Sequence, residues 1–331
     1  MDFYKLISRF QQFGGIKLVI EYAKLGVLSV VVKRFFHCLI QRQSFKAIYP
    51  EVLCRIEPVL IKKHESILQC KKEEIRVKEL KHEHPKVIWW CWLQGIETAS
   101  PIVRVCYNSL KQHLTDYEIK VIDNKNWKEY VVLPDYVVEK WEKGRIPVAN
   151  FSDLLRLELL IKYGGTWIDS TVLCTGFGTQ MTQKTQTFLD SDLFVFQYTP
   201  QGTTKDISIS NWFISAHSNN EVLMVLQNML FAYWKDYNCT LDYYMFHLFF
   251  QMVAREYPEQ VGAMPYGCSQ ESIALMKHWN ETFKQKQWDK LVSKVAFHKL
   301  SHRVSEEVKN NNDNYYNYIL RATMTYTNLN E

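Results

Sequence analysis

The fold is decided by the stretch Phe151-Ser-Asp-Leu-Leu-Arg-Leu-Glu-Leu-Leu-Ile-Lys-Tyr-Gly-Gly-Thr-Trp-Ile-Asp-Ser-Thr171, which predicts a helix followed at once by a buried strand. Ser152 is a favourable helix N-cap, and leucines cover the buried sides of the helix. Gly164-Gly165 supplies a left-handed C-cap, and Thr166-Trp167-Ile168 then predicts a short strand that ends at Asp169. Open α/β sheets bind ligands at the carboxyl ends of their strands, so Asp169 is a candidate ligand-binding residue.

Two further charged residues accompany this aspartate. Asp153 and Arg156 are three positions apart and therefore lie on one face of the predicted helix. Together with Asp169 they can converge on one pocket, which would suit a charged, phosphorylated ligand. The alternative is that Asp153 and Arg156 merely solvate the helix and that Asp169 closes a turn, and these residues alone leave both interpretations open.

The segments on either side of this stretch alternate between strand and helix patterns from Pro85 onward. The predicted strands are 87–92, 119–122, 194–197 and 209–215, and the predicted helices are 101–113 and 135–143. This alternation predicts an α/β fold with a mixed, mostly parallel sheet and covering helices.

The first part of the chain has a different pattern, which predicts an α-helical region at 1–83 and a second domain at 84–331. Its first fifty residues carry eight Lys or Arg against two acidic residues. The apolar run from Leu25 to Val32 is much shorter than the ~20 residues that a membrane-spanning helix needs. Basic helices with apolar sides can lie in the interface of an anionic membrane, or they can pack as a hairpin on the second domain.

The composition narrows the class of protein. A net charge of +5 is mild, and the chain contains no recognised nucleic-acid-binding module, so we expect no nucleic-acid partner. The eight cysteines show neither C-x-x-C pairs nor metal-binding spacing, which favours reduced thiols. The high content of Tyr, Phe and Trp suits a large core, with some rings free to stack on bases and sugars.

Several motifs together resemble a known family. Ser152-Asp-x-x-Arg156, followed by Tyr163-Gly-Gly-x-x-x-Asp169, resembles the central motif of the "DxD" glycosyltransferases of GT-A fold. The similarity is greatest to the bacterial capsular polysaccharide synthesis glycosyltransferases, with yeast mannosyltransferases and clostridial glucosylating toxins more distant. Similar segments occur at 85–95, 116–123, 209–213, 241–247 and 297–302, so the resemblance covers roughly residues 84 to 303.

The resemblance implies a Rossmann-like nucleotide-sugar-binding domain and a retaining hexosyltransferase. The donor would be a nucleotide sugar, most simply UDP-linked, and the acceptor a lipid-linked oligosaccharide used in capsule or exopolysaccharide synthesis. With its basic N-terminal helices, the enzyme would be cytoplasmic and bound peripherally to the inner face of the plasma membrane. Two alternatives remain open: a toxin-like transferase that glycosylates a protein, and a non-catalytic nucleotide-sugar-binding subunit at the membrane.

The same resemblance implies roles for individual residues. The candidate catalytic residues are Asp153, Arg156, Asp169 and Asp242. The candidate nucleotide-sugar-binding residues are Trp92, Gln94, Asp123, Asp153, Arg156, Asn211, Trp212, His247 and Lys299. For Trp92 and Trp212 the alternative is core packing, and for Asp242 it is helix capping. No enzymic nucleophile is evident, which favours front-face displacement with the β-phosphate accepting the proton of the acceptor.

One position departs from the family pattern. The DxD motif normally ends in a second aspartate, but here Asp169-Ser170-Thr171 ends in a threonine, whose hydroxyl is a neutral and weaker oxygen ligand. Mn²⁺ or Mg²⁺ accepts oxygen ligands and waters, so Asp169, Thr171 and the donor diphosphate can still bind the ion. His298 is the expected third protein ligand, with a purely structural histidine as the alternative.

Overall fold

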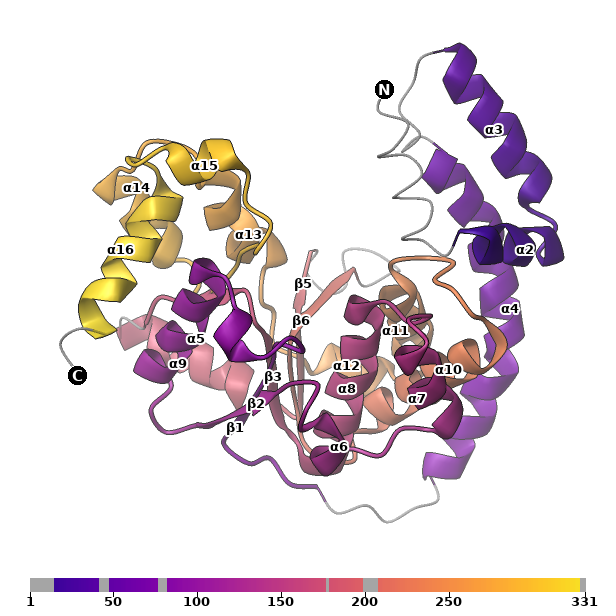
Figure 1. Ribbon diagram of the computed structural model, residues 1–331. Coiled ribbons are helices and arrows are strands. Elements are labelled where there is room, and N and C mark those ends of the chain that lie inside the picture. The colour runs from indigo at the N-terminus through magenta and orange to yellow at the C-terminus, as the bar shows by residue number, and fades with distance from the viewer. Residues whose placement is uncertain (1–14, 42–47, 77–81, 177–178, 199–207, 328–331) are drawn as a thin grey trace. The chain divides into compact units, whose positions relative to one another are not determined.

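The computed structural model describes residues 15–41, 48–76, 82–176, 179–198 and 208–327, and the chain forms two compact units (Figure 1). One unit comprises residues 1–79, 132–157 and 221–256; it is helical wherever it is described, and we call it the helical unit. The other comprises residues 80–131, 158–220 and 257–331; it contains the described strands, and we call it the sheet unit. The predicted domain boundary between residues 83 and 84 stays a prediction.

A five-stranded mixed sheet forms the centre of the sheet unit, in the order β2-β1-β3-β6-β5 (Figure 1). Its strands are β1 (Val87–Cys91), β2 (Glu118–Ile122), β3 (Gly165–Asp169), β5 (Leu193–Gln197) and β6 (Ile209–Ala216). β1 is parallel to β2 and β3, whereas β6 is antiparallel to β3 and β5. Four of the five described strands of this sheet therefore run in one direction, which confirms the predicted mostly parallel sheet.

Helices cover this sheet, as the α/β pattern predicted. The helices of the sheet unit are α5 (Pro101–His113), α9 (Thr179–Leu189), α13 (Ser269–His278), α14 (Gln285–Val292) and α16 (Tyr315–Thr327), with shorter turns η2 (Ile96–Thr98), α6 (Trp127–Tyr130), α12 (Pro258–Gly262) and α15 (Glu306–Asn310). Val103, Cys106 and Leu110 of α5 recur at helical spacing, and all three are buried in one apolar cluster with Trp90 and Phe213 of the sheet.

The helix α8 (Val148–Tyr163) leads into β3 through two glycines in left-handed conformation, as predicted. Gly164 has φ +72°, and its N–H closes the helix on the carbonyl of Leu160 at 2.8 Å. A Cβ atom at Gly164 would lie 2.4 Å from the carbonyl oxygen of Glu83, so no larger residue fits without a shift. The chain therefore leaves α8 and enters β3 with almost no connecting loop.

A small second sheet follows β3. β4 (Val172–Cys174) pairs antiparallel with β7 (Phe297–Lys299), and Val172 lies opposite Lys299. This pairing brings a segment from near the C-terminus beside the carboxyl end of β3.

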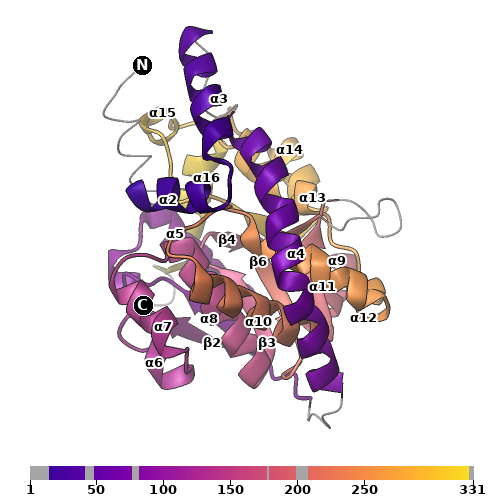
Figure 2. The same ribbon diagram turned by 90° about the vertical axis from the view of Figure 1, so that its right-hand side faces the viewer.

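The helical unit consists of α2 (Ile16–Lys24), α3 (Leu28–Ile40), α4 (Ile48–Arg76), α7 (Asp135–Glu142), the first part of α8, α10 (Glu221–Asp236) and α11 (Met245–Glu256). The long helix α4 packs along α10 and α11 (Figure 2). Lys140 of α7 donates from its ammonium to the carbonyls of Trp234, Lys235 and Tyr237, which satisfies the C-terminal end of α10. Among the described helices, none is long and apolar enough to cross a membrane.

Candidate functional site

Three parallel strands of the sheet unit end at the same level. Cys91, the last residue of β1, pairs with Ile122 of β2 on one side and with Asp169 of β3 on the other. Trp92 and Asp123 follow directly after these pairs. The carboxyl edge predicted from the sequence therefore exists, and it carries three of the predicted site residues.

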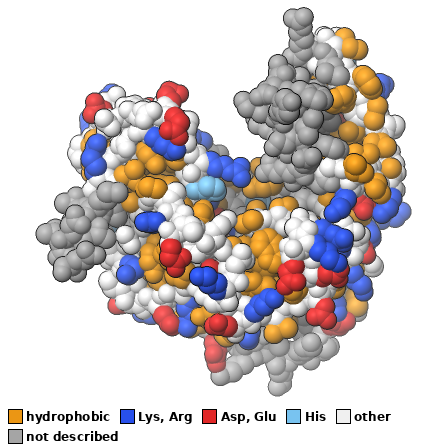
Figure 3. Space-filling view, in the orientation of Figure 1, with side chains coloured by type: hydrophobic (Ala, Val, Ile, Leu, Met, Phe, Trp, Pro, Cys, Tyr) orange, Lys and Arg blue, Asp and Glu red, His pale blue; other side chains and the backbone are white. Residues whose placement is uncertain are grey.

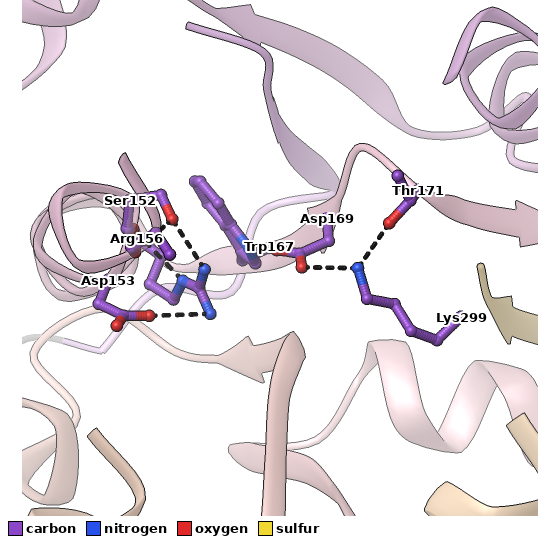
Figure 4. Close-up of polar contacts among 8 residues, drawn as sticks. Ser152, Asp153, Arg156, Trp167, Asp169, Thr171 and Lys299 are labelled. Atoms are coloured by element: carbon purple, nitrogen blue, oxygen red, sulfur yellow. Dashed lines mark hydrogen bonds and ion pairs between the residues drawn. The ribbon is translucent and has the colours of Figure 1, made fainter. Parts of the chain in front are cut away.

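Asp169 is held at this edge by two hydrogen bonds that use different oxygen atoms (Figure 4). Its Oδ1 accepts a hydrogen bond of 2.9 Å from Nε1 of Trp167, two positions earlier on the same strand face. Its Oδ2 accepts one of 3.0 Å from Nζ of Lys299, which also donates to Oγ1 of Thr171 at 2.5 Å. An ammonium group therefore lies between the two oxygen atoms that the sequence predicted as metal ligands.

His298 occupies a different environment from its neighbour Lys299. It is fully buried, opposite Leu173 in the β4–β7 pair, and its Nε2 lies 3.1 Å from Oγ1 of Thr175. Burial lowers the pKa of His298 to about 4, so its imidazole is neutral near pH 7. No group of three or more His, Cys, Asp or Glu in the described part of the chain could hold a metal ion. Metal binding by Asp169, Thr171 and His298 stays a prediction.

The predicted nucleotide residues lie around the ends of β1 and β2. The half-buried ring of Trp92 makes an edge contact with His302 at 5.5 Å between centroids, and Gln94 is exposed two residues later. Oδ1 of Asp123 accepts hydrogen bonds from the N–H groups of Lys125 at 2.7 Å and Asn126 at 3.1 Å. Asp123 thus closes the turn before α6.

The antiparallel strand β6 begins at this same edge. Its last register pair with β3 is Phe213 with Ile168, so Asn211 and Trp212 lie just beyond it, level with the carboxyl end of β3. Trp212 is 5% exposed, and its ring stacks on that of Phe196 with 4.5 Å between centroids. This agrees with the alternative interpretation of Trp212 as a core residue. Asn211 is half-buried on the neighbouring position of the strand.

The helical unit holds a second polar group, on α8 (Figure 4). Nη1 of Arg156 lies 3.3 Å from Oδ1 of Asp153, and both side chains are buried. The guanidinium also donates to the carbonyl and the hydroxyl of Ser152, at 3.3 and 3.1 Å. The predicted N-cap role of Ser152 is wrong, because α8 begins at Val148. Inside the helix the Ser152 hydroxyl donates instead to the carbonyl of Ala149 at 2.7 Å.

His247 and Asp242 also belong to the helical unit. Burial first, and then the positive charge of Arg156, lower the pKa of His247 to about 4. Asp242 is buried before the start of α11, and its Oδ1 accepts a hydrogen bond of 2.8 Å from the N–H of Tyr244. Asp242 therefore shapes the turn that leads into the helix. A role toward a substrate stays a prediction.

The structure thus brings Asp169, Thr171 and Lys299 together in the sheet unit, and Asp153, Arg156 and His247 in the helical unit. Convergence of the two groups on one ligand stays a prediction. Sequence reasoning missed Trp167, although its position two residues before Asp169 places both side chains on one strand face. It also missed Thr175, which no local pattern connects with His298.

Comparisons with known proteins agree with the motifs. Residues 39–319 match the family described as "Capsular polysaccharide synthesis protein", so the chain belongs to this family. Family and motifs together make it, by class, a glycosyltransferase of capsular polysaccharide biosynthesis. A search of curated proteins found no match. Among solved structures the chain is similar to "PaToxG Glycosyltransferase", at 14% identity and a TM-score of 0.39, covering 80% of this chain and 96% of that one.

Proposed function

We propose that this protein transfers a hexose from a UDP-linked nucleotide sugar to a lipid-linked oligosaccharide during capsule or exopolysaccharide assembly, with retention of the anomeric configuration. The observation that carries the proposal is the cluster of Asp169, Thr171 and Lys299 at the carboxyl edge of the sheet. A departing nucleoside diphosphate is strongly anionic, and a cation held beside it stabilises that charge. The family supports the pathway, and the cluster supports the chemistry.

Each polar group has a proposed task. Lys299 pairs with the diphosphate, Asp169 binds the ribose and an ion, and Arg156 with Asp153 binds the sugar hydroxyls. Trp92 and Asp123, after β1 and β2, border the base and ribose, while Asn211, Trp212, His247 and Asp242 border the sugar and acceptor. His247 and His298 are neutral near pH 7, with pKa values of about 4, and so carry no proton to donate as general acids. Front-face displacement, in which the β-phosphate accepts the proton of the acceptor, needs no enzymic base.

A divalent ion, Mn²⁺ or Mg²⁺, is part of the proposal. Oδ2 of Asp169 and Oγ1 of Thr171 already converge on one cation, the Lys299 ammonium, and both are hard oxygen ligands. These two oxygens fit such an ion if the ammonium moves aside, with the diphosphate and water completing the coordination. When bound, the ion would supply Lewis-acid stabilisation of the leaving diphosphate.

The donor and acceptor are tested together. Purified protein is incubated with a panel of UDP- and GDP-linked hexoses, with and without Mn²⁺, and nucleoside diphosphate release is followed. Release should require one UDP-linked donor and should rise when a polyprenyl-linked oligosaccharide is added. Nuclear magnetic resonance of the product should show the anomeric configuration of the donor.

The matched control is Asp169→Asn, which keeps the size of the side chain and removes its charge. Release from no donor, or equal release by Asp169→Asn, would contradict the transferase proposal. Stimulation by a protein acceptor in place of the lipid-linked one would replace the proposed acceptor with the toxin-like alternative.

We also propose that the helices α2 and α3 attach the protein to the inner face of the plasma membrane, with the catalytic machinery in the cytoplasm. Val32, Phe36 and Ile40 are exposed at i, i+4 and i+8, so they form one apolar stripe on α3. Ile16 and Ile20 repeat this spacing on α2. Figure 3 shows apolar and basic side chains gathered over these helices. An anionic lipid surface would bind both kinds of side chain.

The stripe is tested with vesicles of phosphatidylserine and phosphatidylcholine. The triple variant Val32→Ser/Phe36→Ser/Ile40→Ser should lose most of its vesicle binding, because each buried apolar side chain is worth about 1.5–3 kcal/mol. The double variant Val132→Ser/Val148→Ser changes two exposed residues elsewhere in the helical unit and should bind normally. Salt should weaken the attachment of the wild type. Unchanged binding of the triple variant would remove these helices from the membrane interface.

A further inference from the structure

The Lys299 ammonium lies where a divalent ion would have to bind. It donates to Oδ2 of Asp169 at 3.0 Å and to Oγ1 of Thr171 at 2.5 Å. These are the same two oxygen atoms that the proposed ion needs. One position between two oxygen ligands therefore has two candidate cations, one covalently attached to the protein and one from solution.

The protein builds this position rigidly. Pairing of β4 with β7 sets Lys299 opposite Val172, directly after Thr171 in the chain. The indole of Trp167 holds the other carboxylate oxygen of Asp169 at 2.9 Å. Thr171 is 4% exposed, which further restricts its hydroxyl. The oxygens are thus preorganised for a cation, while the ammonium is carried by a flexible four-carbon stem.

The two cations cannot share the position. A divalent ion and an ammonium at the same pair of oxygen atoms would lie in contact, and like charges at that distance repel strongly. The side chains of Lys299 and Asp169 are 22% and 25% exposed, so the ammonium has access to solvent and can leave. The departing ammonium would then be free to meet an anionic ligand at the same edge.

We propose that Lys299 is a resident counter-ion that occupies the divalent-ion position in the free protein and is displaced onto the diphosphate when ion and donor bind together. This inference rests on the proposed function, because it concerns the donor diphosphate of that reaction. It predicts that the free protein binds the ion weakly and that a nucleoside diphosphate strengthens ion binding. The lysine thereby couples the two binding events.

Binding of Mn²⁺ to the free protein tests the proposal without any turnover. Electron paramagnetic resonance measures free Mn²⁺ in titrations of the wild type, Lys299→Met and the control Lys294→Met, which removes an exposed ammonium five residues away. Lys299→Met should bind Mn²⁺ about ten- to a hundredfold more tightly than the other two, the equivalent of one charge-assisted hydrogen bond no longer opposing the ion. Lys299→Gln repeats the test with a polar side chain, should the Met variant fold poorly.

A second titration includes UDP. UDP should tighten Mn²⁺ binding more in the wild type and in Lys294→Met than in Lys299→Met. Only the first two proteins keep the Lys299 ammonium, which can pair with the diphosphate once the ion displaces it. Adding Asp169→Asn to Lys299→Met should abolish the gained affinity. Equal Mn²⁺ affinities of wild type and Lys299→Met, or no Mn²⁺ binding by either, would overturn the proposal. The first titration needs no donor sugar, so its outcome does not depend on the transferase assay. A failure of that assay alone would count against the proposed function and not against the exchange of cations.

Discussion

Two aspartate–cation contacts among the predicted site residues are nearly equal in length and differ in almost everything else. Arg156 lies 3.3 Å from Asp153, three residues away on one helix, and their side chains are 4% and 10% exposed. Lys299 lies 3.0 Å from Asp169, which is 130 residues away, and their side chains are 22% and 25% exposed. The comparison teaches that burial ties the local pair to the stability of the fold. Solvent access allows the ammonium of the distant pair to leave its carboxylate for a ligand.

The largest effect is expected from breaking the buried pair. Arg156→Met should lower the free energy of unfolding by about 3–5 kcal/mol, because Asp153 is left as a buried charge without its guanidinium. Lys299→Met should cost less than about 1 kcal/mol, as is usual for solvent-accessible pairs. Urea unfolding followed by circular dichroism measures both.

The double variant Asp153→Asn/Arg156→Met is the matched control for that experiment. It removes the charge of Asp153 together with that of Arg156 and should be more stable than Arg156→Met alone. Equal losses for Arg156→Met and Lys299→Met would erase the distinction between the two pairs.

The next largest effect concerns activity. Asp169→Asn should reduce transfer about 10²–10³-fold, or about 2.7–4 kcal/mol, because the preorganised carboxylate that is proposed to bind the ribose and the divalent ion is lost. Its free energy of unfolding should change by less than about 1 kcal/mol, since the pair with Lys299 is open to solvent. Steady-state kinetics measures the effect on transfer, and urea unfolding measures the effect on stability. A variant that is fully active, or one that is unfolded, would contradict this assignment.

Each region also contains a histidine whose pKa is about 4, the half-buried His247 in the helical unit and the buried His298 in the sheet unit. Between pH 6.5 and 4 the unfolded chain takes up a proton at each ring while the folded one does not, so stability should fall as the pH is lowered through this window. The loss is at most about 3.4 kcal/mol per histidine.

Unfolding free energies measured from pH 7 to pH 4 test this. His298→Gln should make the decline shallower, whereas His278→Gln, at a half-buried histidine paired with Glu281, should leave it as steep as in the wild type. An unchanged slope in His298→Gln would mean that the imidazole is protonated in the fold.

The smallest effect refines the helical pair. Ser152→Ala removes the hydroxyl that accepts a hydrogen bond of 3.1 Å from Nη2 of Arg156. It should lower the free energy of unfolding by about 0.5–1.5 kcal/mol, the usual net worth of one such bond. A loss as large as that of Arg156→Met would indicate that Ser152, and not Asp153, is the main partner of the guanidinium.

Local patterns predicted the elements well. The helix predicted at 101–113 is α5 with the same bounds, and the predicted strands agree with β1, β2, β3, β5 and β6 to within one residue at each end, whereas β4 and β7 were not predicted. Helix periodicity and glycine conformation are properties of neighbouring residues, which explains this success. Ser152 was misplaced because α8 starts one turn earlier than its best capping residue suggests, at Val148, which no short polar side chain precedes.

The features of the candidate site also divide into those set by spacing within one element and those set by contacts between distant elements. The sequence by itself determined that Asp153 and Arg156 share a helix face and that Asp169 ends a buried strand, because spacing along one element sets those positions. Only the tertiary structure decided that the Lys299 ammonium lies between Asp169 and Thr171, that His298 turns to Thr175, and that Trp212 stacks on Phe196. These contacts depend on how β7 pairs with β4 and how β6 reverses beside β3, and no spacing within a single element encodes the pairing of distant strands.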